Sequence, residues 1–137
     1  MSAVNLGAGY SAEDLADIPG TTIFTIASAC RAYELHRFCM SLMKPNNRSA
    51  FQANEGNYLA GFAMSPDQHE AVLARDYNRL IAAGGNIYFL VKIANTDGWS
   101  TMKAVSTMSG LSTEQYEAMM RTGGRSPDGH RSIRAAR

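Results

Sequence analysis

The chain has little of what marks several large classes of protein. No apolar run among its 137 residues approaches the roughly 20 residues that a membrane-spanning helix needs. Lysine and arginine number 13 against 12 acidic residues, and the net charge of +1 argues against nucleic acids or anionic membranes as partners. Residues 1–17 have no basic n-region and no apolar h-region, so we expect no secretory signal there.

Cysteine is scarce as well. The sequence holds Cys30 and Cys39, which on one helix would lie about 180° and roughly 13 Å apart. A disulfide requires Cα atoms within about 7 Å of each other. We therefore expect two reduced thiols and a cytoplasmic protein. Cys39 falls on an apolar stripe, which favours a small buried side chain over a nucleophile.

The histidines are few and form no metal-binding motif. A non-haem Fe(II) site needs two histidines and one carboxylate with open coordination positions. His36, His69 and His130 show none of the HxE, HxxE or HExxH arrangements that such sites use. We therefore expect histidines that pack or face solvent, and no metal bound by this chain.

What is present indicates one globular, all-α domain. The composition is 45% hydrophobic and 18% charged, which is typical of a folded chain with its own core. We expect several short to medium helices in a compact core at 18–123, between an extended N-terminal arm at 1–17 and a C-terminal arm at 124–137.

Helical spacing and capping signals place the elements. One apolar stripe comprises Leu35, Phe38, Cys39, Leu42 and Met43. A second comprises Val72, Leu73, Tyr77, Leu80 and Ile81. Pro45 is expected to end the first helix, and Asn46 to cap the next one. Capping boxes are expected at 65–68 and 112–115, and the glycines at 84–85 are expected to end the helix that carries the second stripe.

Residues 87–91 are ambiguous from local propensity. Their β-branched and aromatic side chains favour a strand, but the chain offers no partner strand. We interpret the segment as a buried helix.

Asp76 lies on the apolar side of the second stripe. A carboxylate in that position must be paired or hydrogen-bonded. We expect it to meet an arginine of the C-terminal tail or a helix N-terminus. Arg75 and Arg79, which flank it, are expected to be solvated or interfacial.

A long series of motifs resembles one known family. The series is Met40-Ser-Leu-Met-Lys44 with Asn47, Arg48 and Phe51, then the run 74–90, then Gly123-Gly-Arg-Ser-Pro-Asp-Gly129. It resembles the small (alpha) subunit of protocatechuate 4,5-dioxygenase, an extradiol aromatic-ring-opening enzyme, from about residue 17 to residue 133. The resemblance also supports the helical interpretation of 87–91.

The resemblance implies a non-catalytic subunit. In such enzymes a large beta subunit holds Fe(II) through two histidines and a glutamate, and a catecholic substrate and O2 meet at that iron. The small subunit acts as a lid that excludes water and shapes the substrate pocket. A heteromer such as α2β2 is implied, with no catalytic residue and no metal in this chain.

The resemblance also suggests positions for the pocket wall and the subunit interface. Trp99, Thr101 and Val105 are expected in the wall of the substrate pocket. Threonine at 101 replaces an aromatic residue frequent in the family, so the preferred substrate stays open between protocatechuate and a related catechol or gallate with a different ring substituent. The tail is expected to lie across the partner subunit through Arg125, Ser126, Pro127 and Arg131. The alternative is a stand-alone helical binding or regulatory module.

Overall fold

The structure is all-α throughout the residues that it describes. The computed structural model describes residues 11–17 and 21–125, and no strand occurs within these ranges. The helices are α1 (Ala12–Ala16), α2 (Ile26–Arg31), α3 (Tyr33–Ser41), α4 (Pro45–Ala53), α5 (Glu55–Leu59), α6 (Pro66–Ala74), α7 (Tyr77–Ala82), α8 (Ile87–Thr96), α9 (Thr101–Ser109) and α10 (Thr113–Arg121). The expected fold class is confirmed. The segment 87–91 is the first half of α8, so its helical interpretation is confirmed too.

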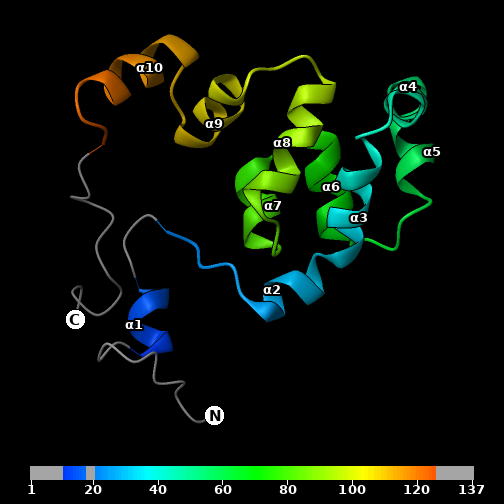
Figure 1. Cartoon of the computed structure of the whole chain (residues 1–137), viewed down its shortest axis with the longest axis horizontal. Coiled ribbons are helices and arrows are strands. Elements are labelled where there is room, and N and C mark those ends of the chain that lie inside the picture. Colours follow the sequence, from blue (N-terminus) through cyan, green and yellow to red (C-terminus); the bar gives the residue numbers. More distant parts are fainter. Residues whose placement is uncertain (1–10, 18–20, 126–137) are drawn as a thin grey trace.

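The helices assemble around α3 and α8. These two pack together, α6 and α7 lie behind them, and α4 and α5 flank α3 (Figure 1). Figure 1 shows α9 and α10 extending from one end of this body, whereas α2 lies at the other end. The division into a core and two arms stays a prediction, although α1 shows that the N-terminal arm contains a short helix of its own.

The core is built from the apolar stripes of these helices. Its members include Leu35, Phe38, Cys39, Phe51, Leu59, Val72, Leu80, Leu90 and Ile93, each fully buried. Burial of such side chains contributes about 1.5–3 kcal/mol each. Two stripe members are corrections, because Met43 of the first stripe is 60% exposed and Leu73 of the second is 42% exposed.

The capping boxes at 65–68 and 112–115 are confirmed. The Ser65 hydroxyl accepts the Gln68 N–H at 3.1 Å, and the Gln68 side chain accepts the Ser65 N–H at 3.1 Å. Gln68 also donates its amide protons to the carbonyls of Arg31 (3.0 Å) and Ala83 (3.1 Å). These two carbonyls lie at the C-terminal ends of α2 and α7, where backbone acceptors lack helical partners. One buried amide therefore joins three helix ends.

Two expected helix boundaries are wrong. Pro45 begins α4 instead of ending α3, and Lys44 is the N-cap residue in place of Asn46. Proline suits the first helical position because its missing N–H would be unpaired there. The second stripe belongs to two helices, since Arg75 (φ 54°) is left-handed and separates α6 from α7.

Asp76 and Arg75 exchange their expected roles at this break. The exposed Asp76 is the N-cap of α7 and accepts the Arg79 N–H at 3.1 Å, which confirms a helix N-terminus as its partner. Arg75 is the buried member, with its side chain 15% exposed. Its guanidinium donates to Asp97 (2.6 Å) and to Glu55 (3.1 Å), so it joins α5 to the end of α8. Burial alone would lower the pKa of Arg75, but these two carboxylates raise it above its ordinary value.

Candidate functional site

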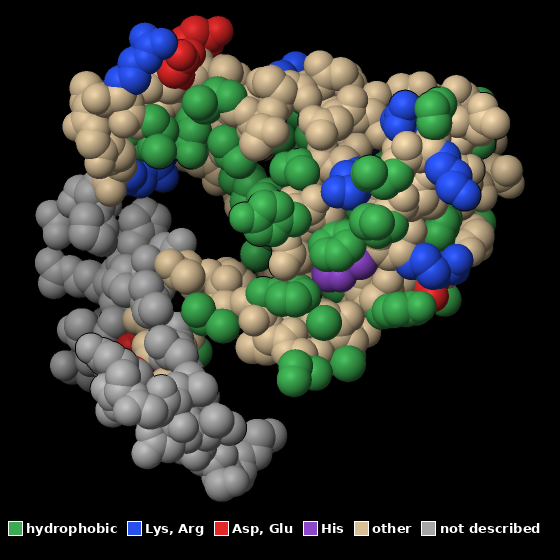
Figure 2. Space-filling model, in the orientation of Figure 1, with side chains coloured by type: hydrophobic (Ala, Val, Ile, Leu, Met, Phe, Trp, Pro, Cys, Tyr) green, Lys and Arg blue, Asp and Glu red, His purple; other side chains and the backbone are tan. Residues whose placement is uncertain are grey.

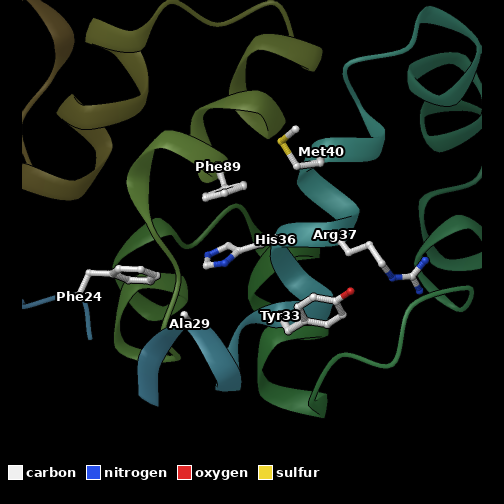
Figure 3. A pocket seen from close by; sticks show the side chains of 7 residues that line it. All are labelled: Phe24, Ala29, Tyr33, His36, Arg37, Met40 and Phe89. Carbon is white, nitrogen blue, oxygen red and sulfur yellow. The ribbon is translucent and has the colours of Figure 1, made fainter. Parts of the chain in front are cut away.

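The described residues form an open apolar pocket of about 450 Å³ between α2, α3 and α8. Its lining consists of Phe24, Ala29, Tyr33, His36, Arg37, Met40 and Phe89. Figure 3 shows Phe24 and Phe89 beside the His36 ring, whereas the Arg37 guanidinium points away. That guanidinium pairs with Glu34 (2.7 Å), so Arg37 gives the pocket mainly its apolar stem.

His36 is the polar group of this pocket. It is 9% exposed and stacks on Phe89, with 4.3 Å between ring centroids. Its Nε2 atom accepts the backbone N–H of Asn86 at 2.9 Å. A ring nitrogen that accepts a hydrogen bond carries no proton, so the proton of the neutral imidazole is on Nδ1. Burial lowers the pKa of His36, which also favours the neutral form.

The Nδ1–H group of His36 has no hydrogen-bond partner within the described part of the chain. Among the described residues, the fully buried side-chain nitrogen and oxygen atoms without a hydrogen-bond partner comprise the Tyr77 hydroxyl alone. The unpaired Nδ1 atom of His36 is therefore not fully buried and reaches accessible space. Because His36 lines the pocket, this donor is available to whatever fills it.

Stability is expected to depend on pH through His36. Its folded-state pKa lies below the unfolded value of about 6.5, so the unfolded chain binds the proton more readily. Stability is therefore complete above about pH 6.5 and falls as the pH drops toward the folded-state pKa. Urea unfolding at about pH 7.5 and about pH 5.5 measures this loss.

The matched comparison uses two glutamine variants. His36→Gln should reduce the loss of stability between the two pH values, while His69→Gln, on α6 outside the pocket, should retain it. Equal losses in both variants would show that His36 is not the responsible group.

Exposed apolar side chains occur on the helices that form the pocket. Tyr33, which is part of the lining, is 65% exposed. Ile26, one turn before Ala29 on α2, is 85% exposed, and Tyr88, next to Phe89 on α8, is 78% exposed. Figure 2 shows hydrophobic side chains gathered in the middle of this side of the molecule, with Lys and Arg side chains beside them and few Asp or Glu. We call this surface the α2–α3–α8 face, defined by the pocket lining together with Ile26 and Tyr88.

The expected pocket-wall residues lie elsewhere, at the start of α9. Trp99 is half-buried against the core, and the Lys103 ammonium lies 4.5 Å from the centroid of its ring. Thr101 is the first residue of α9 and is exposed. Val105 is one turn further on and half-buried. Thr101 and Val105 therefore share one side of α9, and their role in a substrate pocket stays a prediction.

The expected interface residues fall at the edge of the described chain. Arg125 is exposed and donates to the Ser109 carbonyl at 3.0 Å, which holds the start of the tail against the end of α9. Ser126, Pro127 and Arg131 lie outside the described residues.

The described residues show no metal-ligand cluster and no disulfide. Within 11–17 and 21–125, no three His, Cys, Asp or Glu side chains lie close enough to hold a metal. Cys30 and Cys39 are both free thiols, as expected. Burial raises the pKa of Cys39 to about 12, so this thiol is not ionised near neutrality. No helix of the described chain is long and apolar enough to cross a membrane.

Sequence patterns did not reveal the pocket. The sequence indicates a packing or surface histidine at position 36, which agrees with the burial of His36 but does not predict its unpaired Nδ1–H donor. The available signal was the spacing of Tyr33, His36 and Met40, which places a polar ring between two apolar side chains on one side of a helix. That spacing does not show that α8 supplies a second wall.

One family model matches the chain. It is described as "LigA: Aromatic-ring-opening dioxygenase LigAB, LigA subunit", and it matches residues 35–121. This range covers more than half of the 137 residues, from within α3 to the last residue of α10. It contains His36, Arg37, Met40 and Phe89 of the pocket and all three residues expected in the pocket wall.

Proposed function

The chain belongs to the LigA family, the LigA subunits of the LigAB aromatic-ring-opening dioxygenases, and we propose that it is the lid of a heteromeric extradiol enzyme. Membership makes it a dioxygenase subunit and implies a LigB-type partner. The observation that carries the proposal is the family match across 35–121, which agrees with the longer resemblance along the sequence. We further propose cytoplasmic assembly with the partner, in an α2β2 or similar complex.

In this proposal the large beta subunit holds the catalytic Fe(II). The described residues of this chain include no cluster of side chains that could hold iron, and we propose that the iron ligands belong to the large subunit. The iron would supply the site where a catecholic substrate and O2 meet. The contribution of this chain would be to cover that site, exclude water and shape the space around the ring substituents.

The start of α9 is proposed as the part that meets the substrate. Thr101 is exposed and Val105 is half-buried on the same side of the helix, so both can add to a wall contributed by the partner. Trp99 is stacked under Lys103 and anchors the turn that precedes them. We propose the tail, with Arg125, Ser126, Pro127 and Arg131, as one contact with the large subunit.

Substituting Thr101 is expected to change substrate ranking. Thr101→Phe should narrow the pocket, and one methylene in such a site is worth about 1–3 kcal/mol of discrimination. The exposed position should leave folding unchanged. Relative kcat/KM across catechols that differ only in ring substituents measures the effect, in the reconstituted complex.

A double variant tests whether the neighbouring Trp99 indole moves and masks the effect of Thr101→Phe on the pocket. Thr101→Phe with Trp99→Ala removes the Trp99 indole, which could otherwise turn into the same space. If both variants keep the wild-type ranking, Thr101 does not line the pocket and the chain acts by covering the site.

Co-expression with a LigB-type subunit tests the proposed function as a whole. A tag on this chain should retain the large subunit at a fixed ratio, and the iron of the complex should follow the large subunit after dissociation. If the chain elutes alone under all conditions, the proposal is wrong, and a stand-alone helical binding module becomes the better description.

A further inference from the structure

The α2–α3–α8 face carries several large apolar side chains that are exposed to solvent. Tyr33 and Met40 of the pocket lining are exposed by 65% and 49%, and Ile26 and Tyr88, on two of the helices that form the pocket, are exposed by 85% and 78%. Contiguous apolar patches of this kind mark binding surfaces on soluble proteins. Tyrosine and methionine, here Tyr33, Tyr88 and Met40, are residue types enriched in such surfaces.

The pocket within this face holds a polar group that lacks a partner. His36 is nine-tenths buried, its Nε2 atom is occupied by Asn86, and its Nδ1–H group is unpaired among the described residues. Because Nδ1 reaches accessible space, the donor can be hydrated in the free chain. An occupant that displaces this water must supply an oxygen acceptor at the same point, or the donor is left buried without a partner.

The unpaired charge beside the face is basic. The Lys92 ammonium on α8 lies 6.0 Å from the centroid of the Phe89 ring, and Figure 2 shows Lys and Arg side chains beside the apolar ones, with few Asp or Glu. Arg37 on α3 is paired with Glu34, so this acid is already neutralised. The surplus is basic, and a complementary partner presents an apolar centre with an acidic rim.

We infer that the α2–α3–α8 face is the docking surface for the LigB-type large subunit. An apolar segment of that subunit covers the pocket, and one of its oxygen atoms accepts the Nδ1–H of His36. The inference rests on the proposed function, and it adds a second contact, formed by the folded body, to the one proposed for the tail.

Two other occupants fit the face less well. A second copy of this chain, docked through the same face, would bring its basic rim against an identical basic rim, which disfavours association. A small molecule in the pocket would leave Ile26 and Tyr88 uncovered, since neither lines it. A large subunit with acidic groups satisfies both the apolar and the charged parts.

The test measures affinity between the purified full-length chain and a separately purified LigB-type subunit by isothermal titration calorimetry. Ile26→Ser with Tyr88→Ser removes exposed apolar area without touching the core, and should raise Kd by about tenfold or more. His36→Phe keeps an aromatic ring but deletes both the Nδ1–H donor and the Nε2 acceptor of the Asn86 N–H, and should also raise Kd. Leu73→Ser on α6, a leucine that is 42% exposed, and Met120→Ser on α10, 50% exposed, are matched controls that should leave Kd within about twofold.

The outcomes separate the inference from the proposed function. If the wild-type chain binds the large subunit and the Ile26/Tyr88 variant binds equally well, this face is not the docking surface, although the proposed function stands. If that variant instead abolishes a homodimer seen by sedimentation, the occupant is a second copy and the inference is overturned. If the wild-type chain does not bind at all, both fail. Far-UV circular dichroism of each variant verifies the fold.

Discussion

Replacing Arg75 with alanine is expected to cost about 2–4 kcal/mol of stability, because it leaves two carboxylates without their cation. Glu55 and Asp97 are 33% and 19% exposed, so water relieves part of the loss and the lower half of that range is expected. The same change removes the contact of the guanidinium with the Phe51 ring, 5.3 Å from its centroid. Urea unfolding of the isolated chain measures the difference.

Two control variants separate the contribution of the Arg75 ion pairs to stability from the contribution of its left-handed backbone. Arg79→Ala breaks the pairs with Asp67 and Glu70, which are 54% and 67% exposed, and should cost less than about 1 kcal/mol. Arg75→Gly should be less damaging than Arg75→Ala by about 1 kcal/mol, since glycine suits the left-handed backbone (φ 54°). Equal losses for Arg75→Ala and Arg79→Ala would show that the junction of α5, α6 and α8 does not depend on this arginine.

Gly84→Ala is expected to destabilise the chain by about 2–4 kcal/mol, the combined cost of a left-handed alanine and a steric clash. Gly84 has φ of +100°, and an added Cβ would lie 2.8 Å from the Ser28 carbonyl oxygen. That oxygen belongs to the backbone of α2, so relief requires α2 to move away from the α7–α8 turn. Thermal unfolding followed by circular dichroism gives the shift in Tm.

Gly98→Ala provides the control for Gly84→Ala. Gly98 has φ of +78°, and nothing lies within 4 Å of an added Cβ, so only the backbone cost of about 1 kcal/mol is expected. The difference between the two variants isolates the close approach of α2. If both lose the same stability, α2 is not held by that contact. Because α2 contributes Ala29 to the pocket, Gly84→Ala is also expected to weaken docking of the large subunit.

Local sequence signals predicted the helices well where the determinants are local. The capping boxes that begin at Ser65 and Ser112 depend on a hydroxyl and an amide three residues apart, and both formed as expected. The break between α6 and α7 was not predictable in this way. It places a non-glycine residue, Arg75, in a left-handed conformation, and its ion-pair partners are 20 and 22 residues away. Tertiary pairing of this kind overrides local propensity and leaves no periodic signal.

The candidate site was also only partly predictable from the sequence, because part of it depends on tertiary packing. The resemblance led to the start of α9 and to the tail, because motifs can be matched position by position. The α2–α3–α8 face depends on how helices from separate segments pack, with Ile26 and Phe89 more than 60 residues apart. Its apolar residues are scattered along the sequence, and only the packed structure shows that they are left uncovered together.

Oxygen consumption by the large subunit, titrated with this chain, tests whether the chain is the subunit that completes a ring-cleaving dioxygenase. A fixed amount of a LigB-type subunit, loaded anaerobically with Fe(II), is mixed with a catechol and increasing amounts of the chain. We expect ring cleavage to rise with added chain and to reach a plateau at a fixed subunit ratio, while the chain alone consumes no oxygen. Activity of the large subunit that is already complete without this chain, and unchanged by adding it, would contradict the account.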